Sequence, residues 1–135
     1  MNLKIYLLLV IMLTNLFVRE PKVKIYMIGD STMANKAVSA YPETGWGQVF
    51  HEYFTEDVCI SNHALNGFST RSFIEKNKWQ PVLDSLKEGD YVFIEFGHND
   101  EKVSKLGGSN LEDFRKYLSR KCCEASFVCT SQTSL

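Results

Sequence analysis

The sequence predicts an α/β fold, in which helices cover both faces of a parallel β-sheet. Three short apolar segments have the length and composition of buried strands: residues 23–28, 58–60 and 91–96. Segments with helical apolar spacing lie between them and after the last one. Because each connection is long enough to contain a helix, successive strands are expected to pair in parallel through right-handed crossovers. The expected layers are therefore helix, sheet and helix.

The first strand is rich in β-branched residues and ends abruptly at Gly29-Asp30-Ser31-Thr32. In the segment that follows, four apolar residues stand at positions i, i+3, i+4 and i+7, which form one face of a helix. They are Trp46, Val49, Phe50 and Tyr53. We expect this aromatic stripe to pack in the core rather than to bind a ligand.

The second strand runs into Asn62-His63-Ala64. A second helix with the same spacing follows, with Pro81 near its start, where the missing N–H of proline costs little. Its apolar positions are Trp79, Val82, Leu83 and Leu86, and Gly89-Asp90 ends it. After the third strand, Ser109 begins the pattern Ser109-Asn110-Leu111-Glu112, which is typical of a capping box at the start of a further helix.

Length and composition indicate one ordinary globular domain. The chain has 135 residues, of which 44% are apolar and 23% are charged. The formal net charge is -1, so the charge balance gives no indication of a nucleic acid partner.

The N-terminal segment, residues 1–20, has the pattern of a secretory signal peptide. Lys4 precedes an apolar run, residues 5–18, which Arg19-Glu20-Pro21 ends. A membrane-spanning helix needs about 20 apolar residues, and this run is shorter. We therefore expect a secreted or periplasmic protein, with no stable membrane association unless the leader stays uncleaved. Because no Ala-x-Ala site follows, an uncleaved anchor is one alternative, and a buried first strand or helix is another.

The 4 cysteines do not have the spacing of a metal site. Cys59 stands alone, and Cys122, Cys123 and Cys129 crowd into the last part of the chain without a Cys-x-x-Cys pair. An exported protein could oxidise them, but the sequence leaves the pairing open. No metal and no cofactor is predicted.

Polar residues gather in the loops that follow the three predicted strands, residues 29–34, 62–73 and 97–100. In an open parallel sheet, functional groups lie beyond the carboxyl ends of the strands. Acyl transfer from an ester requires a nucleophile, a base and donors to the oxyanion. Ser31 is the candidate nucleophile, while the Gly67 N–H and the Asn99 side-chain amide are candidate oxyanion donors.

Each of these three residues also has an ordinary structural interpretation. Ser31 could cap a helix, Gly67 could serve a plain turn, and Asn99 could form an Asx-turn at a strand end. A phosphate-binding flavodoxin-type domain is disfavoured, because the first turn lacks a glycine-rich cradle and places a carboxylate where phosphate would sit. The coincidence of three polar loops at one edge of the sheet favours catalysis.

Three motif blocks in these loops resemble those of the SGNH (GDSL-like) hydrolases. In family order they are Gly29-Asp30-Ser31, Gly67 within Asn-x-Ala-x-x-Gly-x-Ser-Thr-Arg-Ser-Phe, and Gly97-His98-Asn99-Asp100. The segments Asp30-Ser31-Thr32-Met33-Ala34 and Gly45-Trp46-Gly47-Gln48 are most similar to the rhamnogalacturonan acetylesterase branch. The resemblance covers about residues 22–120.

This resemblance implies a flavodoxin-like, three-layer α/β/α fold with strand order 2-1-3-4-5. It also implies hydrolysis of acetyl esters on a pectin- or rhamnogalacturonan-type polysaccharide or oligosaccharide, without a metal or cofactor. Ser31 would be the nucleophile, and its N–H, the Gly67 N–H and the Asn99 side chain would form the oxyanion hole. Substrate-binding residues are not identified, although three side chains could contact a sugar or serve packing and surface roles: Tyr41, Trp46 and Arg71.

The sequence departs from this family at one point that matters for catalysis. The family's Asp-x-x-His motif, which supplies the base and its orienting acid, is absent from these 135 residues. His51 is expected on the solvated surface of the first predicted helix. His63 and His98 stand at positions that the family does not use as base, and substitution of the base by one of them is the less favoured alternative. Because removal of the base costs roughly 10⁶ in turnover in a serine hydrolase, we expect the chain alone to be inactive or severely impaired. The alternative is a non-catalytic remnant or carbohydrate-binding module of the same fold.

The predicted organisation is a leader or anchor (residues 1–20), the N-terminal part of an SGNH hydrolase domain (residues 22–120) and an aberrant or disordered tail (residues 121–135). With only the first three family strands present, residues 91–96 would form an open apolar edge prone to aggregation. From residue 121 the helical apolar spacing breaks. We expect a chain truncated at its C-terminus by a frameshift or an early end, with a natural short variant as the alternative.

Overall fold

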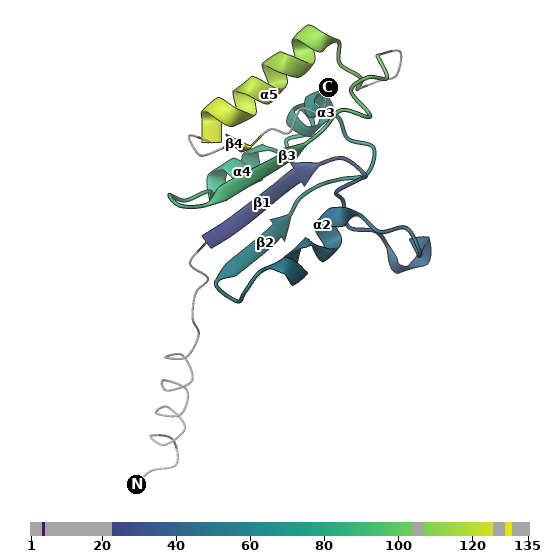
Figure 1. The fold of residues 1–135 in the computed structure, drawn as a ribbon. Coiled ribbons are helices and arrows are strands. Elements are labelled where there is room, and N and C mark those ends of the chain that lie inside the picture. The colour runs from purple at the N-terminus through teal and green to yellow at the C-terminus, as the bar shows by residue number, and fades with distance from the viewer. Residues whose placement is uncertain (1–3, 5–22, 104–106, 126–128, 131–135) are drawn as a thin grey trace.

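The computed structural model describes residue 4 and residues 23–103, 107–125 and 129–130. Its centre is a parallel sheet with the strand order β2-β1-β3-β4, in which every neighbouring pair is parallel. The strands are β1 (Val23–Gly29), β2 (Val58–Asn62), β3 (Tyr91–Glu95) and β4 (Cys129–Thr130). Helices lie on both faces of this sheet (Figure 1). The α/β class, the three predicted strands and the start of the expected strand order are confirmed.

The fourth strand corrects the expectation of only three strands. Cys129 pairs with Val92, and Thr130 pairs with Phe93. The prediction that residues 91–96 form an open edge is therefore wrong at Val92 and Phe93. Strand pairing uses the backbone N–H and C=O groups that nearly every residue carries, so the polar composition after residue 125 did not reveal this short strand.

β1 is the buried centre of the sheet and has a layer of core on each side. Successive side chains of a strand point to opposite faces. Tyr26 and Ile28 therefore pack with side chains of α3 (Thr70–Glu75) and α4 (Gln80–Ser85). Ile25 and Met27 pack in the second cluster, on the side of α2 (Trp46–Val49). Figure 1 shows α3, α4 and α5 (Leu111–Ala125) on one face and α2 on the other.

The aromatic stripe after β1 is less regular than predicted. α2 passes directly into the 3₁₀ helix η2 (Phe50–Tyr53), and the other 3₁₀ helix of this region is η1 (Val38–Ala40). Phe50 packs against the core, but Trp46 is 38% and Tyr53 is 79% exposed. A 3₁₀ turn has 3.0 residues rather than 3.6, so the predicted face does not persist. The assignment of Trp46 and Tyr53 to the core is therefore wrong.

The start of α5 differs from the prediction by one residue. Asn110, rather than Ser109, caps this helix, since its Oδ1 accepts a hydrogen bond from the Asp113 N–H at 2.8 Å. The Ser109 hydroxyl is buried and donates to Asp100 Oδ1 at 2.8 Å. The sequence pattern assigned Ser109 to the helix cap, but its hydroxyl instead forms a hydrogen bond with Asp100, which lies outside the helix.

α5 also continues to Ala125, beyond the break expected at residue 121. Lys121 interrupts the apolar spacing, yet it is fully buried. Its ammonium group donates to the Thr70 carbonyl oxygen at 3.1 Å and lies 5.1 Å from the centre of the Phe96 ring. Because its ammonium group has these partners, Lys121 can be buried at a position where the helical pattern required an apolar residue.

In the parts of the chain that the structure describes, no helix has the length and apolar character needed to cross a membrane. The predicted leader lies outside the described residues apart from Lys4. Its role in export stays a prediction.

Candidate active site

The sheet brings the three loops of interest to one edge. β1 lies between β2 and β3, with Met27 beside Asn62 and Gly29 beside Glu95. Because both pairs are parallel, the loops that contain Ser31, Gly67 and Asn99 all leave the sheet at its carboxyl edge.

The turn after β1 holds Ser31 by contacts on either side of it. Asp30, which is 2% exposed, accepts a hydrogen bond from the Thr32 N–H at 3.0 Å. The Asp30 N–H donates to the Glu95 carbonyl oxygen at 3.2 Å, and the Trp46 N–H donates to the Thr32 carbonyl oxygen at 3.0 Å. Ser31 itself is half-buried. Neither its N–H nor its hydroxyl forms a hydrogen bond with the rest of the described chain, so both stay available to a ligand.

Glu95 is a residue of this site that the sequence analysis did not predict. Its two carboxylate oxygens accept hydrogen bonds from Thr32 Oγ1 at 2.5 Å and from Trp46 Nε1 at 2.8 Å. The last residue of β3 thereby joins the Ser31 turn to the start of α2. The available signal was a single carboxylate in an otherwise apolar strand.

A second link joins the Ser31 loop to the Gly67 loop. The Lys36 side chain is 6% exposed, and its Nζ donates to Asn66 Oδ1 at 3.0 Å and pairs with Glu43 at 2.7 Å. Asn66 precedes Gly67 directly. The link between this buried lysine and the Gly67 loop was also not predicted, because Asn66 lies 30 positions away in the sequence.

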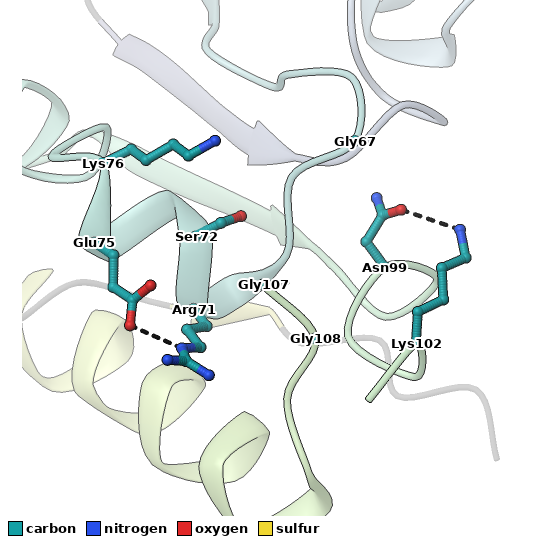
Figure 2. A pocket seen from close by; sticks show the side chains of 9 residues that line it. All are labelled: Gly67, Arg71, Ser72, Glu75, Lys76, Asn99, Lys102, Gly107 and Gly108. Carbon is teal, nitrogen blue, oxygen red and sulfur yellow. Dashed lines mark hydrogen bonds and ion pairs between the residues drawn. The ribbon is translucent and has the colours of Figure 1, made fainter. Parts of the chain in front are cut away.

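Gly67 and Asn99 line the same cavity, which has a volume of about 280 Å³ (Figure 2). The other lining residues are Arg71, Ser72, Glu75, Lys76, Lys102, Gly107 and Gly108. Gly67 has a φ of +76°, a backbone conformation that favours glycine. Its N–H has no hydrogen-bond partner in the described part of the chain. Ser31 does not line this cavity, although its loop leaves the sheet at the same edge.

Asp100 joins the loop that contains Gly67 to the loop that contains Asn99. This carboxylate is 3% exposed and accepts hydrogen bonds from the Thr70 N–H at 3.1 Å, from Thr70 Oγ1 at 2.5 Å and from Ser109 Oγ at 2.8 Å. Thr70 begins α3, three residues after Gly67, and Asp100 follows Asn99. The spacing between the two candidate oxyanion donors therefore depends on a buried hydrogen-bond network.

The three side chains considered for sugar contact have different surroundings. Arg71 lines the cavity and pairs with Glu75 at 2.8 Å. The Trp46 indole is bonded to Glu95. Tyr41 is 85% exposed.

The histidines have partners other than Ser31 in the described structure. His63 Nε2 lies 2.8 Å from Ser61 Oγ, His98 Nδ1 lies 3.3 Å from Glu101 Oε1, and His51 Nδ1 lies 3.1 Å from the Gln48 carbonyl oxygen. Burial and the nearby charge of Lys24 lower the pKa of His63. Among the described residues, no group of three or more metal-binding side chains is suited to hold an ion.

Two solved structures share the fold of this chain. The crystal structure of protein YxiM from Bacillus subtilis matches with a TM-score of 0.67 and 25% identity over 78% of this chain and 30% of that chain. A member of the lipolytic G-D-S-L family from Veillonella parvula matches with a TM-score of 0.57 and 20% identity, over 77% of this chain and 53% of that chain. The flavodoxin-like fold expected for a GDSL-like chain is thereby confirmed.

Sequence comparison gives the branch. The chain is 42% identical to the rhamnogalacturonan acetylesterase RhgT of Bacillus subtilis, over 59% of this chain and 34% of RhgT. It is 45% identical to a rhamnogalacturonan acetylesterase of Emericella nidulans, over 56% of this chain and 28% of that protein. The matched region spans about a third of these relatives, and no protein-family model matches the chain. The resemblance to SGNH hydrolases of the rhamnogalacturonan acetylesterase type is confirmed.

Proposed function

We propose that this chain carries the nucleophile and the oxyanion hole of a serine carboxylic ester hydrolase that removes acetyl groups from a polysaccharide or oligosaccharide. One observation supports this most directly. The N–H groups of Ser31 and Gly67 have no partner in the described chain and, with the Asn99 amide, lie in loops at one edge of the sheet. The relatives named as rhamnogalacturonan acetylesterases suggest the acetylated sugar substrate.

In this proposal, Ser31 Oγ attacks the acetyl carbonyl carbon and loses its proton to a base. The negative charge that forms on the carbonyl oxygen is stabilised by the N–H groups of Ser31 and Gly67 and by the Asn99 amide. The intermediate then releases the sugar alcohol, which takes up a proton, and leaves acetyl-Ser31. Water hydrolyses this ester to acetate and restores the serine. The base is not assigned, because no histidine contacts Ser31 in the described structure.

Labelling with a fluorophosphonate in the presence of imidazole, which can take the proton of the serine, tests the proposal, because the reagent reacts with an activated serine whose adduct oxygen is stabilised. Peptide mass spectrometry should find the adduct on Ser31, and Ser31→Ala should abolish it. Asn99→Ala should slow the labelling by about a hundredfold, as loss of one oxyanion donor does in other hydrolases. The exposed Ser39 provides the control. Labelling of Ser39 and Ser31 at equal rates would show that Ser31 is an ordinary hydroxyl.

A carbohydrate-binding role without catalysis is the second candidate, and the lack of a histidine beside Ser31 favours it. Calorimetric titration with an acetylated pectic oligosaccharide separates the two. Binding together with an unlabelled Ser31 would support the second candidate over the first.

A further inference from the structure

The Asn99 amide is held from both of its ends. Its Nδ2 donates to the Phe68 carbonyl oxygen at 3.0 Å, and its Oδ1 accepts from Lys102 Nζ at 3.2 Å. A flipped amide would place an oxygen against the Phe68 carbonyl and an NH₂ group against the lysine ammonium. Both of those contacts are repulsive, so the two partners together fix the orientation of the amide.

One N–H of this amide remains unused in the described structure, because an NH₂ group has two hydrogens and Phe68 accepts only one. Figure 2 shows the oxygen of Asn99 directed toward Lys102 and its nitrogen on the side of Gly67. Asn99 lines the same cavity as Gly67. Its unused N–H is therefore a candidate donor to a ligand in that cavity.

We propose that Lys102 is a positioning residue for Asn99. Its ammonium group holds the amide oxygen and draws electron density toward it, which makes the unused N–H a stronger donor to an oxyanion. This inference rests on the proposed function, since it gives Lys102 a role in the same oxyanion hole. Lys102 would act through Asn99 rather than by touching the substrate.

The other basic side chains of the cavity have different partners. Lys76 Nζ lies 5.0 Å from the centre of the Phe68 ring, and Arg71 Nε pairs with Glu75. Lys76 is unsuitable as a control, because Phe68 also holds Asn99. Lys78→Met removes the same charge from an exposed lysine that does not line this cavity. It is the matched control for Lys102→Met.

The test measures the rate constant for fluorophosphonate labelling of Ser31 in the full 135-residue chain, with imidazole present as the base. Lys102→Met should slow labelling about tenfold, which corresponds to the loss of one charge-assisted hydrogen bond. Lys102→Arg, which keeps a cation and N–H donors, should restore most of the rate, and Lys78→Met should leave it unchanged. In NMR spectra, the side-chain amide resonances of Asn99 should move in Lys102→Met and not in Lys78→Met.

The possible failures are distinct. If Ser31 is labelled equally fast in the wild type and in Lys102→Met, the role of Lys102 is overturned and the proposed function stands. If Ser31 is not labelled in the wild type, the proposed function fails, and the catalytic role of Lys102 fails with it. Unchanged Asn99 resonances in Lys102→Met would overturn the positioning itself, whatever the labelling result.

Discussion

Gly45 has no room for a side chain beside the Ser31 loop. An added Cβ would lie 1.9 Å from the Ala34 carbonyl oxygen, which is a backbone atom. Gly45→Ala should therefore separate the two segments and lower the free energy of unfolding by about 3 kcal/mol, as overpacking does in other proteins. Urea unfolding followed by circular dichroism measures this. In Gly97→Ala, where no atom lies within 4 Å of the new Cβ, a loss of similar size would contradict the steric explanation.

His63 gives the stability a pH dependence with a defined sign. Burial, followed by the charge of Lys24, lowers the pKa of His63 in the folded state. The unfolded chain therefore binds the proton at a higher pH than the folded chain does. Stability from this group is fully present above its unfolded pKa of about 6.5, and it is lost as the pH falls through the folded pKa.

His63→Asn should consequently flatten the dependence of the unfolding free energy on pH below about 6.5. Denaturant unfolding at a series of pH values measures the slope. His98→Asn is the control, because the His98 side chain is 60% exposed and pairs only with its neighbour on the turn, Glu101, in the described structure. An unaltered slope in His63→Asn would show that this histidine does not contribute to the acid sensitivity.

At the scale of elements, local patterns predicted β1, β2 and β3, because a buried strand needs several apolar residues in succession, but they did not predict the short β4. The same patterns placed Ser31, Gly67 and Asn99 at strand ends. They could not reveal Glu95 or Lys36, whose partners lie 63 and 30 positions away in the sequence. The transition from α to 3₁₀ helix at Phe50 was not predicted either.

The start of α3 depends on Asp100, which is another long-range partner. Its carboxylate accepts from the Thr70 N–H and from the hydroxyls of Thr70 and Ser109. Asp100→Asn places an NH₂ group among these donors and leaves at least one of them without an acceptor. We expect a loss of about 2 kcal/mol in unfolding free energy. Asp84→Asn, on the exposed surface of α4, is the control, and equal losses in both variants would contradict the role of the network.

At the scale of the whole molecule, the two core clusters on either face of β1 support the loops of the site without supplying a base. Tyr26, Ile28 and Phe73 pack on one side, and Met27 and Met33 pack on the other. The carboxyl ends of β1, β2 and β3 are thereby held at one edge. The loops that carry the candidate residues Ser31, Gly67 and Asn99 are therefore held together at this edge, while no histidine contacts Ser31 in the described structure.

Hydrolysis of an acetyl ester by the 135-residue chain should for this reason be very slow. Loss of the base in a serine hydrolase lowers turnover by roughly 10⁶, while oxyanion stabilisation preserves a residual rate about 10³–10⁴ above that of water. Hydrolysis of p-nitrophenyl acetate should therefore be weak, reduced further by Ser31→Ala, and raised by added imidazole more in the wild type than in Ser31→Ala. Bacillus subtilis RhgT serves as the active reference. Turnover that is comparable to that of RhgT and is lost in Ser31→Ala would contradict this prediction. It would mean that a residue of this chain acts as the base for Ser31.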